Sequence, residues 1–439
     1  MKLRKLPAFY RPPMLLFVAL FLIGDGIADA NTVDANIADA PSPGAQSAHY
    51  AEMYRITVIY ITGLRRTRFS TAERPLRRFI GMEADQVDRD DVFAAIMAAG
   101  NLEPLYVEIE GQVLAVTVRE QWSVFPVPVL MGGTGGLMGG LAFFDANAFG
   151  LNDQFFLAGM YHPDGWIATV GYNSSSRGGR LPGWNGFFLF SREERHDRCQ
   201  NNELLRRFEL DTIFVNAGLN IPLLPDSDLL SVSAQFAFSD RRLPNPGSAR
   251  NVNAPYTDHL RMFGLGGDFT IRRSNWDGYF LSQEAASIRY FFNTEFGGIS
   301  FHSVQLRANW ERSIVPGFRF MLRSGITFQP NVPVFFESPP GTAQVAILPR
   351  DFSARNYAGL SAGLERSIIR INAGTFSISA SYQVVYSYGS ILGNSVDHGV
   401  LGMFTFYLNR VAIPALSLGV AYNVNRNYFQ GFFGLGMTF

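Results

Sequence analysis

The segment "FSISASYQVVY" (376–386) decides the fold class, because its side chains change character at every second position. Phe376 and Tyr382 fall on one face of an extended chain, whereas Ser377 and Gln383 fall on the other. Such alternation is typical of a β-strand with one apolar and one wet face. A strand of about ten residues is also long enough to cross a lipid bilayer at a tilt.

The same alternation recurs in "HSVQLRANWE" (302–311), "FRFMLRSGITF" (318–328) and "ALSLGVAYNV" (415–424). A soluble β-sandwich would show it too. The polar positions hold Arg, Glu, Gln, Asn, Ser and Gly, which suit a wet lumen. Since only a closed barrel satisfies every backbone group of a sheet in lipid, we favour a membrane barrel.

Turn residues divide residues 121–439 into sixteen candidate strands. These begin near 121, 136, 153, 166, 183, 206, 229, 259, 279, 301, 317, 356, 376, 399, 414 and 427. An even count returns the C-terminus to the side on which the barrel starts. We therefore predict a mainly β protein with a 16-stranded antiparallel transmembrane β-barrel.

The N-terminus predicts export. Basic residues precede the apolar run "MLLFVALFLIG" (14–24), and Ala28-Asp29-Ala30 offers a small-x-small cleavage site. The run is too short for the alternative, a membrane anchor. We assign 1–30 to a signal peptide and the Ala-, Asn-, Asp-, Pro- and Ser-rich residues 31–51 to a flexible linker.

Residues 52–120 predict a small β-α-α-β-β module. "YRITVIYITG" (54–63) is a strand, "RDDVFAAIMAAG" (89–100) is a capped helix that ends at Gly, and "LYVEIEGQVLAVTVRE" (105–120) forms two strands. A second helix is expected between the first strand and residue 89.

This order resembles a POTRA domain, the periplasmic module of outer-membrane assembly proteins. The similar segments are "ITGLRRTR" (61–68), "DDVFAAI" (90–96) and "VLAVTVRE" (113–120), although Gly63-Leu64 replaces the usual Gly-Asn. The resemblance implies a sheet edge that captures partner strands. The alternative is a plain α/β spacer.

The barrel resembles the BamA/TamA-type outer-membrane assembly superfamily, the bacterial surface antigen family. "VREQWSVFPVPVL" (118–130) joins the module to a first strand, and "GGLAFFDANAFGLNDQFFLAGMY" (139–161) resembles the family's second hairpin. The chain ends with a pattern similar to the C-terminal insertion signal, namely Phe432, Gly434, Met437 and Phe439. The signal usually starts with a polar residue, and Phe432 is not one.

The family carries an Arg-Gly-aromatic motif on a long outer loop that folds back into the lumen. The corresponding stretch here is "ILPRDFSARNY" (347–357), where Arg350 and Phe352 match and Asp351 replaces Gly. The resemblance implies that Arg350 binds a carboxylate inside the barrel. Alternatively, Arg350 is an ordinary loop arginine.

The family's receiving carboxylate is replaced by Ser387 in this chain. A guanidinium in a lumen favours a bidentate carboxylate partner. The inward-facing Glu365 and Glu311 are therefore candidate acceptors, and Asp351 could pair locally.

The resemblance implies a non-enzymatic protein that helps to insert or translocate other proteins. Its expected partners are outer-membrane lipid and unfolded β-barrel clients or periplasmic proteins. Clients would be templated at a seam between the first and last strands. Pro126 and Pro128 in the first strand and Gly431, Gly434 and Gly436 in the last weaken pairing there.

Other function classes have less support. The altered loop motif and the single module are also compatible with a passive channel or structural barrel. The six histidines are scattered without a recognisable Ser or Asp set, so we expect no enzyme, metal or cofactor. The formal net charge of zero gives no argument for nucleic acid. The predicted location is the outer membrane, with the module in the periplasm.

Overall fold

The computed structural model describes most of the chain between Arg55 and Leu435. The described residues are 55–97, 101–133, 136–174, 182–198, 204–224, 227–244, 250–251, 259–277, 280–295, 298–338, 341, 344–349, 352–390, 393–408 and 415–435. The expected signal peptide and linker, residues 1–51, lie outside these ranges.

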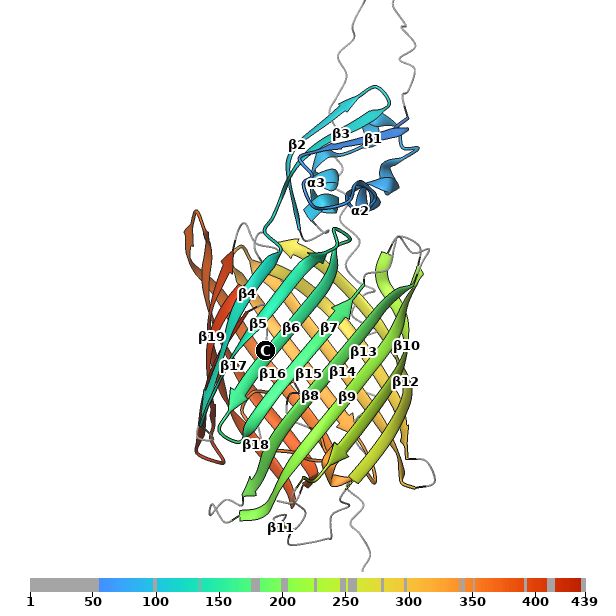
Figure 1. Ribbon diagram of the computed structural model, residues 1–439. Coiled ribbons are helices and arrows are strands. Elements are labelled where there is room, and N and C mark those ends of the chain that lie inside the picture. Colours follow the sequence, from blue (N-terminus) through green and yellow to red (C-terminus); the bar gives the residue numbers. More distant parts are fainter. Residues whose placement is uncertain are drawn as a thin grey trace, which may run out of the picture. The chain divides into compact units, whose positions relative to one another are not determined.

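A small α/β unit comes first in the chain (Figure 1). Its elements are β1 (Val58–Thr62), α2 (Phe69–Glu73), η2 (Arg74–Phe79), η3 (Ala84–Gln86), α3 (Arg89–Met97), β2 (Leu102–Glu110) and β3 (Val113–Glu120). The sheet order is β1-β3-β2, with β1 parallel and β2 antiparallel to β3. One apolar core forms beneath the sheet and includes the buried side chains of Ile56, Leu76, Val92, Ile96 and Leu114. The element order agrees with the β-α-α-β-β prediction.

Among the described residues, sixteen long strands follow and curl into a barrel-shaped antiparallel sheet (Figure 1). They are β4 (Val124–Gly133), β5 (Gly136–Ala148), β6 (Asp153–His162), β7 (Gly165–Asn173), β8 (Gly183–Arg198), β9 (Leu204–Leu224), β10 (Ser227–Arg242), β12 (His259–Asp277), β13 (Phe280–Thr294), β14 (Ser300–Val315), β15 (Phe318–Phe328), β16 (Asn356–Ile371), β17 (Gly374–Ser390), β18 (Gly393–Leu408), β19 (Ala415–Asn423) and β20 (Tyr428–Leu435). Each pairs with the next, and β20 meets β4 through four residue pairs.

The predicted strand count is confirmed, and most starts fall within three residues of their predicted positions. One start was wrong: β18 begins at Gly393 rather than near 399, because "GNSVDH" also pairs with β17. A short extra strand, β11 (Arg250–Asn251), pairs with β9 from within a loop. Glycine and polar residues at those points hide strand starts from a search for apolar alternation.

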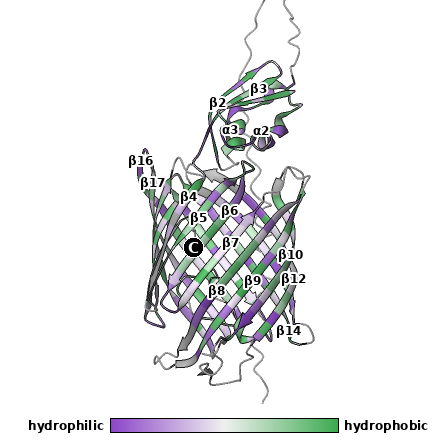
Figure 2. Ribbon diagram, viewed as in Figure 1, coloured by the Kyte–Doolittle hydropathy of each residue, from purple (hydrophilic) through white to green (hydrophobic). Residues whose placement is uncertain are grey.

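The two faces of the strands differ as the alternation predicts. On β17, Ile378 and Tyr382 are 53% and 50% exposed, whereas Ser377 and Gln383 are 0% exposed. Green and purple positions alternate along the barrel strands in Figure 2. A face that exposes so many large apolar side chains is unfavourable in water and favourable in lipid. No helix in the described part of the chain is long and apolar enough to cross a membrane.

Candidate functional site

The first feature of interest is the seam, which we define as the ladder between β4 and β20. Its four pairs are Leu130–Phe433, Met131–Phe432, Gly132–Gly431 and Gly133–Gln430. In comparison, β4 pairs with β5 over ten residues and β19 pairs with β20 over eight. Among the described residues, the seam therefore has half or less of the paired length of either neighbouring ladder.

Proline lies just beyond the described seam. Among the described pairs, Leu130 is the last β4 residue opposite β20, and Pro128 precedes it by two residues. Proline donates no ladder hydrogen bond, and Pro126 repeats this defect two residues earlier. The prolines thus lie next to the described part of the ladder, and weak pairing at the seam stays a prediction.

The residues that resemble the insertion signal are only partly described. Phe432 takes part in the seam and Gly434 lies in β20. Met437 and Phe439 lie outside the described residues, as does Gly436.

The second feature is the lumen loop, which we define as the described residues 344–349 and 352–354 between β15 and β16. Ile347 and Leu348 are 0% and 1% exposed. They belong to one buried apolar cluster with Val385 of β17, Leu401 and Met403 of β18 and Ala421 of β19. These strand residues face inward, so the loop folds back into the barrel and packs against its wall.

Ala346 of the lumen loop bridges two distant strands. Its backbone N–H donates to Oε1 of Gln383 on β17 over 2.8 Å. Its carbonyl oxygen accepts a hydrogen bond from Nε2 of Gln430 on β20. One loop residue therefore connects the interior wall to the strand that forms the seam.

A buried ion pair lies next to the lumen loop. Arg426, in the turn between β19 and β20, binds Asp397 of β18 through two contacts of 2.7 and 2.9 Å. Ser395 and Asn423 also donate hydrogen bonds to the carboxylate of Asp397. The Arg426 guanidinium also lies 4.6 Å from the centre of the Phe352 ring. A bidentate salt bridge thus positions Arg426, and Arg426 contacts the loop through a cation–π interaction with Phe352.

The loop residues expected from the family motif are placed as follows. Phe352 is buried beneath Arg426, whereas Arg350 and Asp351 lie outside the described residues. Ser387 is fully buried and shares a 2.8 Å hydrogen bond with Ser395, which itself donates to Asp397. The carboxylate next to the Ser387 position is therefore Asp397, from the following strand, and its arginine is Arg426.

Sequence reasoning missed the Arg426–Asp397 pair. Arg426 follows the last alternating residue of β19 and reads as an ordinary turn residue. The available signal was Asp397, because a carboxylate on the inward face of a barrel strand requires a partner.

The two glutamates expected as loop acceptors belong to another cluster. Glu365 on β16 lies 2.6 Å from Arg319, and Glu311 on β14 lies 3.1 Å from Arg319 and 2.7 Å from Arg323. Tyr407 also donates to Glu365. All four charged side chains are less than 9% exposed. We name Glu365, Arg319, Glu311 and Arg323 the ionic chain.

We expect Arg426→Lys to loosen the lumen loop, because lysine keeps the charge but loses the bidentate, planar contact. Amide exchange at 346–348 should become about tenfold faster, which corresponds to roughly 1.4 kcal/mol. Hydrogen exchange followed by mass spectrometry measures this rate. The exposed Arg366 provides a matched Arg→Lys control. Equal effects of the two substitutions would contradict the role of Arg426.

The third feature is the loop after β1, "LRRTR" (64–68), which contacts the turn after β5. The Arg66 guanidinium binds Asp145 at 2.5 Å. The backbone N–H of Arg68 donates to the carbonyl oxygen of Gly150 over 2.9 Å. Gly150 has φ +72°, and a Cβ there would lie 2.2 Å from the carbonyl oxygen of Arg66. Glycine is thus required at this approach.

Glu120, at the end of β3, holds the same loop. Its carboxylate oxygens accept hydrogen bonds from the backbone N–H groups of Arg65, Arg66 and Thr67, with N to O distances of 2.6–3.0 Å. Burial by itself would raise the pKa of Glu120, but these hydrogen bonds outweigh burial and lower the pKa. The charged form is therefore the one that orders the loop.

The lowered pKa gives a pH dependence for this loop. The contribution of Glu120 to the stability of the folded state is fully present above its unfolded pKa of about 4.3. This contribution is lost as the pH falls through the lower folded pKa. We expect the Thr67 amide proton shift, followed by NMR, to titrate with a midpoint below 4.3. Glu120→Gln should abolish the titration. A midpoint above that value would contradict the assignment.

The described residues offer no clear metal centre, since no three His, Cys, Asp or Glu side chains among them are placed to hold an ion.

No protein-family model matches the chain, and no curated protein matches it in sequence. Among solved structures, CdiB from Escherichia coli is similar with a TM-score of 0.59 at 13% identity, covering 87% of this chain and 76% of that one. CdiB from Acinetobacter baumannii gives a TM-score of 0.57 at 14% identity, with 87% and 74% covered. BamA from Haemophilus ducreyi gives 0.49 at 13% identity, with 87% and 84% covered. The chain therefore shares its fold with the two CdiB barrels.

Proposed function

We propose that the protein is a non-enzymatic outer-membrane barrel that assists the insertion or translocation of other β-rich proteins. The observation that carries the proposal is the seam of four residue pairs between β4 and β20. A short ladder opens at a lower free-energy cost than the neighbouring ladders of eight and ten pairs. The family resemblance supplies the class of activity.

The edge of β4 that faces β20 gives a proposed mechanism. Val124–Val129 pair with β5, and the described seam with β20 covers Leu130–Gly133. Unpaired strand edges template the addition of another strand. In our proposal, a client strand pairs first with this edge and then extends into the seam.

The lumen loop would make the opening asymmetric. Gln430 holds β20 to Ala346, and eight ladder pairs hold β20 to β19. On the other side of the seam, β4 has ten pairs with β5. We propose that β20 remains on the loop while β4 moves away with β5.

The α/β unit would act as a POTRA-like periplasmic module that first receives the client. The sheet order β1-β3-β2 leaves β1 and β2 as edges. Leu105 and Tyr106 on β2 are 49% and 54% exposed, which gives this edge an apolar surface for a partner strand. The proposal places the barrel in the outer membrane and the module in the periplasm.

The alternative is a passive channel or structural barrel that has lost assembly activity. Its supporting observation is the changed lumen contact, in which Ser387 stands at the family's carboxylate position and Arg426 supplies the arginine. Salt-dependent single-channel conductance without an effect on client folding would favour this alternative.

Reconstitution tests the proposal directly. The mature chain is placed in liposomes, and folding of an added unfolded β-barrel client is followed by its shift in gel mobility on heating. We expect faster client folding than in empty liposomes or in liposomes with an unrelated porin. Equal rates in the three preparations would refute assembly activity.

A further inference from the structure

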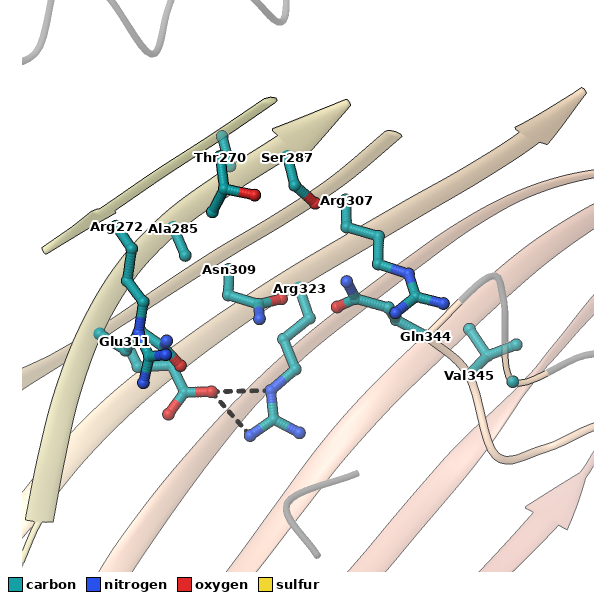
Figure 3. Close-up of a pocket in the computed structure, with 13 residues that line it drawn as sticks. Thr270, Arg272, Ala285, Ser287, Arg307, Asn309, Glu311, Arg323, Gln344 and Val345 are labelled. Carbon is teal, nitrogen blue, oxygen red and sulfur yellow. Dashed lines mark hydrogen bonds and ion pairs between the residues drawn. The ribbon is translucent and has the colours of Figure 1, made fainter. Parts of the chain in front are cut away.

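A hollow of about 470 Å³ lies in the inner wall formed by β12, β13, β14 and β15 (Figure 3). Ala285 and Ser287 of β13 form its floor, because their side chains are too short to fill the lumen in front of the sheet. Gln344 and Val345 of the lumen loop complete its rim.

Two arginines border this floor on opposite sides. The register aligns Arg272 on β12 with Ala285, and Arg307 on β14 with Ser287. Two strand spacings of about 4.8 Å and a two-residue offset of about 7 Å along β13 together separate the two arginine backbones by roughly 12 Å. Both side chains line the hollow, one on each side of Ala285 and Ser287.

These two arginines carry a net positive charge that the described surroundings do not balance. Among the residues drawn in Figure 3, dashed contacts join Glu311 to Arg323 and none reaches Arg272 or Arg307, although Arg307 interacts electrostatically with both Asp268 and Arg289. The ionic chain contains two carboxylates and two guanidiniums, and Asp268 is bound by Arg289. Uncompensated like charges repel each other in a confined space, so an anion stabilises this arrangement.

Asn309 adds a second, independent indication. This residue lines the same hollow, and its buried Oδ1 atom has no hydrogen-bond partner. A buried acceptor without a donor is unfavourable by about 1–3 kcal/mol. A ligand that carries a hydroxyl group would satisfy it.

We propose that this hollow is a binding site for a soluble phosphate group. Hydrogen phosphate offers oxygens that accept hydrogen bonds from the guanidiniums of Arg272 and Arg307. Its hydroxyl group donates to the amide oxygen of Asn309. The hydroxyls of Thr270 and Ser287 and the amides of Gln283 and Gln344 surround the remaining space. Because these residues face the lumen, the ligand enters from the aqueous interior. This inference is independent of the proposed assembly activity.

Calorimetric titration of the detergent-solubilised mature chain with inorganic phosphate, at constant ionic strength, tests the site. We expect saturable binding to one site, and weaker binding of sulfate, which is fully deprotonated at neutral pH. Each lost charge-assisted contact should lower the affinity about tenfold, so Arg272→Gln with Arg307→Gln should lower it about 100-fold. Arg312→Gln is the matched control, because Arg312 lies on β14 and faces outward.

The titrations test whether phosphate binds in the hollow and whether Asn309 takes part. Absence of phosphate binding, or equal binding by the wild type and the Arg272→Gln/Arg307→Gln variant, would overturn the site. Equal affinity for sulfate would overturn the role of Asn309. If the double glutamine variant does not fold, Arg272→Lys with Arg307→Lys retains the charges, and it should bind phosphate with an intermediate affinity.

Discussion

A disulfide across the seam should abolish client folding, and a reductant should restore it. In a Cys199→Ser background, Leu130→Cys with Phe433→Cys places two thiols at directly paired positions of β4 and β20. Paired residues of antiparallel strands have Cα atoms about 4.5–5.5 Å apart, within the range for a disulfide. Because the proposed mechanism requires the seam to open, we expect complete loss of client folding under oxidising conditions.

The control uses the same cysteine on β20. Leu418→Cys with Phe433→Cys joins β19 to β20, which remain together in the proposed mechanism. This variant should keep its activity when oxidised. Full activity of the seam disulfide, with cross-linking verified by mass spectrometry, would show that opening between β4 and β20 is unnecessary.

Removal of Arg319 should produce the largest loss of barrel stability. Arg319 is 3% exposed and is the shared partner of Glu365 and Glu311. Arg319→Met leaves Glu365 without its guanidinium, and breaking such a buried pair costs about 3–5 kcal/mol. Urea unfolding in detergent, followed by tryptophan fluorescence, should show this loss as a lower transition midpoint.

Two further variants identify the cause of that loss. Arg319→Met with Glu365→Gln should recover much of the stability, because the second change removes the unpaired carboxylate. Arg312→Met, on the outward face of β14, should change the free energy of unfolding by no more than about 0.5 kcal/mol. A loss that is equal for Arg319→Met and Arg312→Met would contradict the importance of the ionic chain.

The strand pattern was predictable because each strand carries its own signal. In "FSISASYQVVY" (376–386), lipid and lumen impose opposite requirements on neighbouring residues, so the alternation appears in a single segment. The prolines at 126 and 128 could also be interpreted locally, since a missing N–H weakens any ladder. The strand count follows from such local rules, and weak pairing beside the prolines stays a prediction.

The interior of the barrel was much less predictable. Arg426 and Asp397 are 29 residues apart, and they meet only because the β19–β20 turn returns over β18. Glu365 and Glu311 were correctly expected to face inward, but their partners Arg319 and Arg323 come from the intervening strand β15. A lumen-facing charge predicts that a partner exists, yet strand neighbours and loop placement decide which one.

The sequence alone determined which side of each barrel strand carries the exposed apolar side chains. That property depends on side-chain alternation, which acts within one segment. Only the tertiary structure decided that Ala346 holds β20, that Arg426 covers Phe352, and that Arg272 and Arg307 share a hollow. These contacts join residues from separate strands and loops, and strand register in three dimensions brings them together.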